Sequence, residues 1–173
     1  PQQTVVIDVN CSLEQLFNGS TKKMKITRSI DGRTESKIIE LAIKPGWKDG
    51  TKITYPGEGD IKAGYEPQDV QFVIREIPNG TFKREKDNLV INEVISLKQA
   101  LCGFSLKRKG IDGKTLSLKV EDVLQPGTER RIVGEGMPKK NGGRGDLIFR
   151  FNVAFPHRLT ESQKNAMRSN LPD

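Results

Sequence analysis

The stretch "PGWKDGTKITYPGEGD", residues 45–60, returns in altered form later in the chain as "PGTERRIVGEGMP", residues 126–138. The match extends in both directions. "SLEQLFNGS" from residue 12 corresponds to "SLKQALCGF" from residue 96, and "DVQFVIREIP" from residue 69 corresponds to "DLIFRFNVAFP" from residue 146. "IDGRT" at residues 30–34 matches "IDGKT" at residues 111–115, and the Pro-Gly and Gly-Glu-Gly turns that follow match as well. Five matching segments in the same order indicate a tandem duplication.

Each copy predicts the same local structure. Short runs alternate apolar and polar residues, as in residues 5–9, which is typical of a strand. Ser12 and Ser96 each begin a capping box and predict a short helix, which ends at Gly19 or Gly103 in the left-handed conformation. We therefore predict a mainly β fold of two tandem, small, β-sandwich-like domains of duplicated origin, each with a short helix.

The predicted division follows from the polar stretch "NGTFKREKDN", which has few core residues. It gives a first β domain over residues 1–80 and a second over residues 81–157. Residues 158–173 have no counterpart in the first copy. Thr160 begins a third capping box there, followed by helical spacing of apolar residues. This helix is too short to be stable alone, so it must pack on its own domain or on another chain.

Composition limits the partners. The 173 residues carry a net charge of +7, which favours nucleic acid, a membrane surface or an acidic peptide without choosing among them. No apolar run reaches the length of a membrane helix. Two cysteines, Cys11 and Cys102, lack zinc-ligand spacing and indicate a reducing compartment. Pro1 in place of Met, without a leader sequence, suggests a fragment.

The sequence predicts neither an enzyme nor a cofactor site. The one histidine, His157, has no nucleophile elbow beside it. Gly57 and Gly59 are not followed by a helix signal, so they do not form a nucleotide-binding loop. No metal ligand set is predicted.

Taken together, "SLEQLFNG", "KPGWKDGTKITYPGEGD", "SLKQALCGF" and "GEGMP" with "GRGDLIFRF" closely resemble the C-terminal peptide-binding region of J-domain co-chaperones, the DnaJ family. The chain has no His-Pro-Asp triplet and no Cys-x-x-Cys-x-Gly-x-Gly repeats, so it resembles class II members, which lack the zinc insert. The resemblance implies binding of unfolded client polypeptides and their delivery to a seventy-kilodalton heat-shock chaperone. It also implies binding of that chaperone's acidic C-terminal tail, in the cytoplasm or also the nucleus.

The resemblance further implies a shallow apolar groove in the first domain. Its floor would be formed by Ile7, Val9, Met24, Ile26 and Phe72, and its basic residues would be Lys22, Lys25 and Lys37. Residue parity supports this in part, because Ile7 and Val9 share one strand face, as do Met24 and Ile26. The alternative is an ordinary sandwich core with a solvated lysine face. The matching "LKRKGID" of the second domain lacks the alternating apolar pair, so any groove there should be weaker.

The tail and the charge leave two further alternatives. The resemblance implies a homodimer through a C-terminal dimerisation helix with contacts at Leu159, Met167 and Leu171; otherwise the helix packs back on the second domain. The alternative function is a basic β module that binds nucleic acid. No paired aromatic residues on one strand offer the bases a stacking platform, so we do not expect nucleic-acid binding. We expect no membrane partner either, because no apolar run is long enough for a membrane helix.

Overall fold

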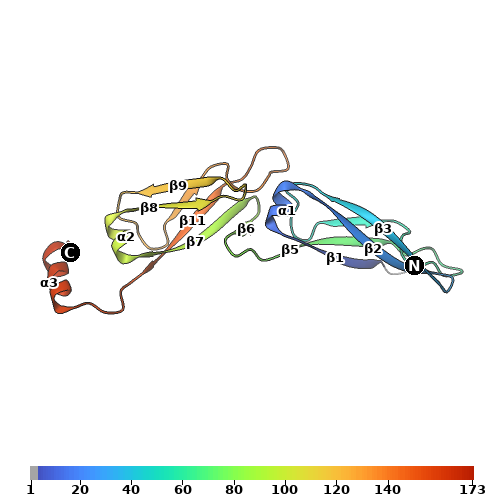
Figure 1. Cartoon of the computed structure of the whole chain (residues 1–173), viewed down its shortest axis with the longest axis horizontal. Helices are drawn as coiled ribbons and strands as arrows, with labels where there is room; N and C mark the ends of the chain where they lie inside the picture. Colours follow the sequence, from blue (N-terminus) through green and yellow to red (C-terminus); the bar gives the residue numbers. More distant parts are fainter. Residues whose placement is uncertain (1–3) are drawn as a thin grey trace.

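The computed structural model describes residues 4–173, which form two β units in line with a helix at the C-terminal end (Figure 1). The first unit contains β1 (Val5–Cys11), α1 (Leu13–Asn18), β2 (Ser20–Ile30), β3 (Arg33–Ile43), β4 (Lys52–Tyr55) and β5 (Val70–Glu76). The second contains β6 (Lys83–Glu85), β7 (Asn88–Ser96), α2 (Leu97–Cys102), β8 (Phe104–Lys109), β9 (Thr115–Val120), β10 (Glu129–Ile132) and β11 (Leu147–Ala154). The tail forms α3 (Glu161–Asn170).

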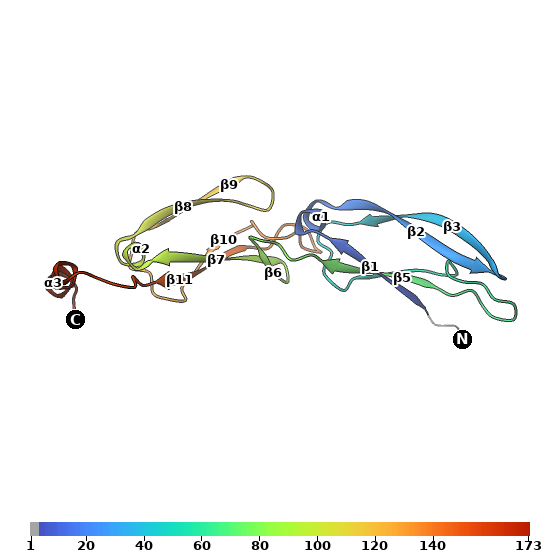
Figure 2. The same cartoon turned by 60° about the horizontal axis from the view of Figure 1, so that its bottom comes forward.

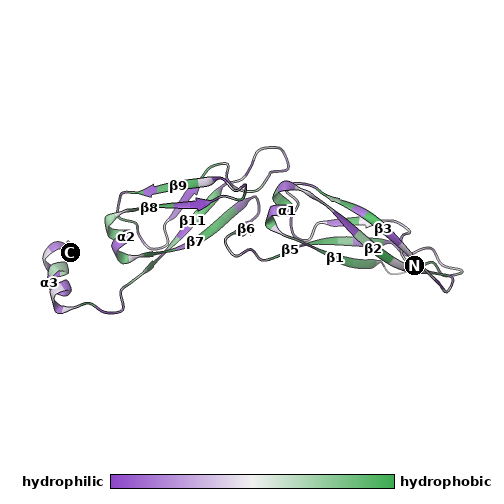
Figure 3. Cartoon of the chain, in the orientation of Figure 1, coloured by the Kyte–Doolittle hydropathy of each residue, from purple (hydrophilic) through white to green (hydrophobic). Residues whose placement is uncertain are grey.

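Each unit has two layers. In the first, β1 lies parallel to β5 in a sheet of order β1-β5-β4, and the β2-β3 hairpin forms the second layer. In the second, the sheet has the order β10-β11-β7-β6, and the β8-β9 hairpin covers it. Figure 2 shows both hairpins as one layer above both sheets. The buried residues lie between the layers, and Figure 3 shows the hydrophobic colour concentrated along β1 and β7. The predicted mainly β, duplicated sandwich fold is confirmed.

Strand register shows where the two copies differ in length. Val5 pairs with Val70 as Leu89 pairs with Leu147, and Ser20 pairs with Ile43 as Phe104 pairs with Val120. These pairs correspond at a displacement of 84 residues before the hairpin tip and 77 after it. The hairpin accounts for the change, because β2 and β3 have 11 residues each while β8 and β9 have 6.

One predicted alignment is wrong. The sequence pairs Pro45-Gly46 with Pro126-Gly127, but the Gly127 N–H donates to the Phe151 carbonyl just as the Gly50 N–H donates to the Ile74 carbonyl. The true equivalent of Gly127 is therefore Gly50. The hydrogen bond to the central strand defines this turn, and the Pro-Gly dipeptide does not.

The Gly-Glu-Gly turns hold the same loop in both units. The Gly57 N–H donates to Asp69 Oδ1 at 2.9 Å, and the Gly134 N–H donates to Asp146 Oδ1 at 3.0 Å. A Cβ on Gly59 would lie 2.7 Å from the Cβ of Gln68, so only glycine permits this close approach. The repeated phrase therefore attaches a loop to the start of β5 or β11.

Both short helices begin as predicted. Ser12 Oγ accepts the Gln15 N–H at 3.1 Å while Gln15 Oε1 accepts the Ser12 N–H at 3.0 Å, and the second unit repeats this capping box. Gly19 has the expected positive φ of 79°, but its ψ of 160° is not left-handed helical, and Gly103 is similar. Both helices therefore end at the predicted glycines, but the predicted left-handed helical conformation is wrong, because the chain extends directly into β2 or β8.

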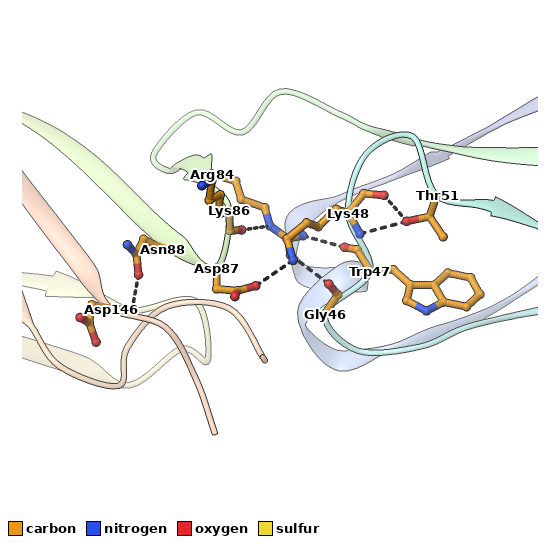
Figure 4. A network of polar contacts seen from close by, with 9 residues as sticks. All are labelled: Gly46, Trp47, Lys48, Thr51, Arg84, Lys86, Asp87, Asn88 and Asp146. Carbon is orange, nitrogen blue, oxygen red and sulfur yellow. Dashed lines mark hydrogen bonds and ion pairs between the residues drawn. The ribbon is translucent and has the colours of Figure 1, made fainter. Parts of the chain in front are cut away.

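The two units meet at a polar network that sequence reasoning did not predict. The chain passes from the sheet of the first unit to the sheet of the second between β5 and β6. Strand β6 lies within the stretch that was expected to be a linker. From β6, the Arg84 guanidinium donates to the carbonyls of Trp47 at 2.7 Å and Gly46 at 3.0 Å (Figure 4). Lys48 pairs with Asp87 at 3.0 Å. Domain boundaries at residues 80 and 157 stay a prediction.

Candidate peptide-binding site

One edge of β1 has no partner strand among residues 4–173. The Val5 N–H donates to the Asp69 carbonyl and the Cys11 carbonyl accepts the Ile77 N–H, so the odd residues of β1 bond to β5. Because bonding direction alternates along a strand, Val6, Asp8 and Asn10 direct their backbone groups to the opposite edge. A free edge of this kind can pair with an added strand.

The predicted floor residues fall into two groups. Val9, Ile26 and Phe72 are buried in the core, where Phe72 packs edge-to-face on Tyr55 with ring centroids 5.5 Å apart. Ile7 and Met24 are half-buried and pack against that core. Of the five predicted floor residues, only Ile7 and Met24 keep accessible surface, while Val9, Ile26 and Phe72 form the core against which they pack. Their role in binding stays a prediction.

The three predicted lysines lie in different settings. Lys22 Nζ donates to the Asn10 carbonyl at 2.6 Å and thus crosses from β2 to the free edge of β1. Lys37 pairs with Glu58 at 2.8 Å, at the same level of the hairpin as Ile26. Lys25 lies between Met24 and Ile26 in sequence, so it points to the opposite face of the hairpin. Lys22 is the basic residue best placed at the edge.

The side chain of Lys22 also acts on its surroundings. Burial raises the pKa of the Cys11 thiol, and the positive charge of Lys22 partly offsets this. Cys11 therefore stays a protonated, buried thiol at neutral pH, and it serves packing. The ammonium group of Lys22 is held near the end of β1 without a carboxylate partner among the ion pairs of the described residues.

Three further residues on β1, β2 and β3 are exposed on the outer faces of the first unit and were not predicted. Val6 on β1 is 56% exposed and Ile38 on β3 is 63% exposed. Lys23 points to the same outer face as Lys25, so that face of the hairpin is basic as well. The signal was present in the sequence, since Ile38 is a large apolar residue at an outward position of the alternation that buries Ile39, Leu41 and Ile43.

A cavity of about 770 Å³ lies elsewhere in the first unit. It is formed at the hairpin tip and the loop before β5, with Asp31, Asp60, Lys62 and Tyr65 among its lining residues. None of the predicted groove residues lines it. Its lining carries charged side chains of both signs, so it does not match the predicted apolar floor.

The second unit differs at the equivalent positions. Register places Glu93 where the first unit has Val9, and Arg108 where it has Met24. Arg108 Nη2 donates to Glu93 Oε2 at 3.0 Å, and Arg108 Nε donates to the other carboxylate oxygen. The expected loss of the apolar pair in "LKRKGID" is thus accompanied by an ion pair between β8 and β7.

The tail helix packs on neither unit. Every residue of α3 is exposed, including Leu159, Met167 and Leu171 around it, which are 38%, 43% and 46% exposed. The alternative in which α3 folds back on the second unit is therefore not observed. Contact with a second chain stays a prediction.

Other classes of site find little support in the described residues. No group of three or more His, Cys, Asp or Glu side chains within residues 4–173 could hold a metal ion. No helix in this range is long and apolar enough to cross a membrane. Trp47 and Tyr55 are half-buried while Tyr65 is exposed beside Lys62, so these three aromatics do not form a common stacking surface.

Comparison with known proteins agrees with the mainly β architecture. Residues 5–156 match the family described as the DnaJ C terminal domain. The chain is 46% identical to human DnaJ homolog subfamily B member 5 over 97% of its length and 51% of that protein. It is 46% identical to Protein psi1 of Schizosaccharomyces pombe, over 96% of this chain and 46% of that one. It is 40% identical to Protein SIS1 of Saccharomyces cerevisiae, over 98% and 49%.

The fold is a tandem β-sandwich, and it corresponds to the region described as the DnaJ C terminal domain. The chain belongs to the DnaJ family, within its C-terminal domain, and its subfamily B relatives agree with the class II expectation. It spans about half the length of the relatives it matches.

Proposed function

We propose that the first unit binds extended polypeptide segments along the free edge of β1. Both unfolded clients and the acidic C-terminal tail of a seventy-kilodalton heat-shock chaperone would bind there, so that the chain acts in client delivery as a co-chaperone. The observation that carries this proposal is Lys22, whose ammonium group bonds a backbone carbonyl on an otherwise unpaired edge. The role is binding and requires no cofactor.

An added strand would use the groups that are available at this edge. The N–H and C=O groups of Val6, Asp8 and Asn10 would form the main-chain hydrogen bonds, which do not depend on sequence. Alternate side chains of the peptide would contact the accessible surface of Ile7 and Met24, whose flexible thioether adapts to varied partners. This combination suits unfolded segments of many sequences.

Acidic peptides would gain one further interaction. When a strand takes over the Asn10 carbonyl, the Lys22 ammonium group is released to bind a carboxylate of the peptide. Charge-assisted hydrogen bonds of this kind are about twice as strong as neutral ones. Lys23, Lys25 and Lys37 add a positive field around the edge, although Lys37 must leave Glu58 to take part.

A homodimer would multiply this binding. Exposed apolar residues at α3 would meet their equivalents in a second chain, and two first units would then hold one long client with raised avidity. We also propose the cytoplasm, or also the nucleus, as the compartment, because Cys11 and Cys102 are both free thiols.

Titration calorimetry with a peptide that ends in Glu-Glu-Val-Asp tests the proposed site. We expect one site per chain and roughly tenfold weaker binding by Lys22→Ala, because a charge-assisted hydrogen bond is lost. Lys140→Ala is the matched control, since Lys140 is an exposed loop lysine of the second unit. Equal weakening by both variants would show a nonspecific effect of charge, and no binding by the unaltered chain would contradict the proposal.

A further inference from the structure

The two units contain the same framework with different residues at its centre. Val9 pairs with Ile74 as Glu93 pairs with Phe151, and on the hairpins Met24 pairs with Ile39 as Arg108 pairs with Leu116. Strand pairing therefore shows that Glu93 occupies the position of Val9 and that Arg108 occupies the position of Met24.

The charge around the edge is largely the same in the two units. By the same register, the positions of Lys23, Lys25 and Lys37 are occupied by Lys107, Lys109 and Lys114. Only Lys22 has lost its charge, because its equivalent is Leu106. A basic rim remains in the second unit, so an acidic peptide would still be attracted to it.

The edge of β7 is also open over much of its length. β6 pairs with β7 only at residues 88–90, which leaves the stretch that corresponds to residues 7–11 of β1 without a neighbour on that side among the described strands. Val94 in this stretch is 68% exposed. The main-chain groups that an added strand needs are therefore present in both units.

The ion pair fills the position where the first unit offers apolar surface. Glu93 is only 8% exposed, and both of its oxygens accept from Arg108, which reaches over from the other layer. An apolar side chain bound here would either cover two charges or separate them. Both changes remove hydration or a hydrogen-bonded partner without replacement, which is unfavourable.

We propose that the Glu93–Arg108 ion pair closes the second unit to extended peptides and makes the first unit the binding unit of the chain. This inference rests on the proposed function of the first unit. It assigns specificity to a pair of residues that hold the two layers of the second unit together. The ion pair then decides whether a unit is open to peptides, and Lys22 is the further difference that favours acidic ones.

Exchange of these residues between the units tests the inference. Adding or removing the ion pair does not change the net charge, because Glu and Arg carry opposite charges. Val9→Glu with Met24→Arg places the ion pair in the first unit. Glu93→Val with Arg108→Met, combined with Leu106→Lys, gives the second unit the residues of the first. Leu106→Lys alone is the control, because it adds the lysine and keeps the ion pair. Circular dichroism checks that each variant is folded, and calorimetry with the peptide that ends in Glu-Glu-Val-Asp counts the sites.

We expect two sites per chain for the opened second unit, one for the Leu106→Lys control and at least tenfold weaker binding for the closed first unit. If the opened unit still binds one peptide while Lys22→Ala weakens that binding, the inference is wrong and the proposed function stands. A second site in the control would also overturn it, since the lysine alone would then suffice. No binding by the unaltered chain overturns both proposals.

Discussion

Asp146 shows how one residue stabilises a repeated loop. Its carboxylate accepts the Gly134 N–H at 3.0 Å and a hydrogen bond from Arg131 at 2.8 Å. These interactions, the first of them the larger, hold the pKa of Asp146 below its ordinary value of 3.8. A carboxyl group whose pKa is lowered on folding stabilises the folded state when it is ionised. This stability is complete above about pH 3.8 and is lost as the pH falls through the lower, folded-state pKa.

We therefore predict that Asp146→Asn lowers the free energy of unfolding at pH 7 by about 1–2 kcal/mol, because the charged acceptor is lost. The variant should also lose less stability than the unaltered chain when the pH falls below 3.8. Urea unfolding at a series of pH values measures both effects. Asp122→Asn, at an exposed position, is the control. Parallel pH curves for Asp146→Asn and the unaltered chain would contradict the prediction.

Residue patterns predicted which side chains share a strand face, but they did not predict how exposed each side chain is. Alternation along β1 and β2 indicated that Ile7 and Val9 share a face, as do Met24 and Ile26, and the buried layer confirms it. The pattern could not show that Val9 would be fully covered while Met24 keeps accessible surface. That difference depends on where the hairpin lies over the sheet, which is a tertiary property.

At the scale of elements, the sequence predicted the long strands, both short helices and α3, because periodicity and capping boxes are local signals. It missed β6, since three residues are too few for a pattern and its pairing with β7 is what makes it a strand. It could not reveal the bond between Glu93 and Arg108, which belong to different layers. The Pro-Gly alignment failed for the same reason, because a distant strand defines that turn.

The free edge of β1 allows a test of strand addition that leaves the fold intact. Asp8 directs its N–H away from β5, so Asp8→Pro removes a donor only from the open edge. We predict at least about tenfold weaker peptide binding, since a main-chain hydrogen bond is lost and the proline ring obstructs pairing. The thermal midpoint should change little. Asp8→Asn controls for the lost charge and for the ion pair with Arg75. Unchanged affinity in Asp8→Pro would show that peptides do not pair with this edge.

At the scale of the whole molecule, the proposed peptide site and the proposed contact between chains lie at opposite ends (Figure 1). The Arg84 network joins the units at the centre through the backbone carbonyls of Gly46 and Trp47. Gly46 also approaches the second unit closely, because a Cβ at this position would lie 2.8 Å from the carbonyl oxygen of Pro138. The first unit with its open edge lies at one end, and α3 lies at the other (Figure 1). A second chain that contacts α3 would therefore leave the β1 edge of both chains accessible. Two distant sites on a joined pair of chains suit a long, unfolded client.

This arrangement predicts that α3 determines assembly and is not needed for folding. Removal of residues 159–173 takes no buried side chain from either unit, so both units should stay folded, and the chain should become monomeric. Sedimentation equilibrium measures the mass, and Met167→Ser with Leu171→Ser in the full chain tests the apolar contact directly. Ser169→Ala in the same helix should leave the dimer unchanged. Affinity for a short peptide should not change on truncation, whereas affinity for a long unfolded client should fall, because one chain offers one site. A dimer that persists after truncation would place the contact between chains elsewhere, on the β units themselves.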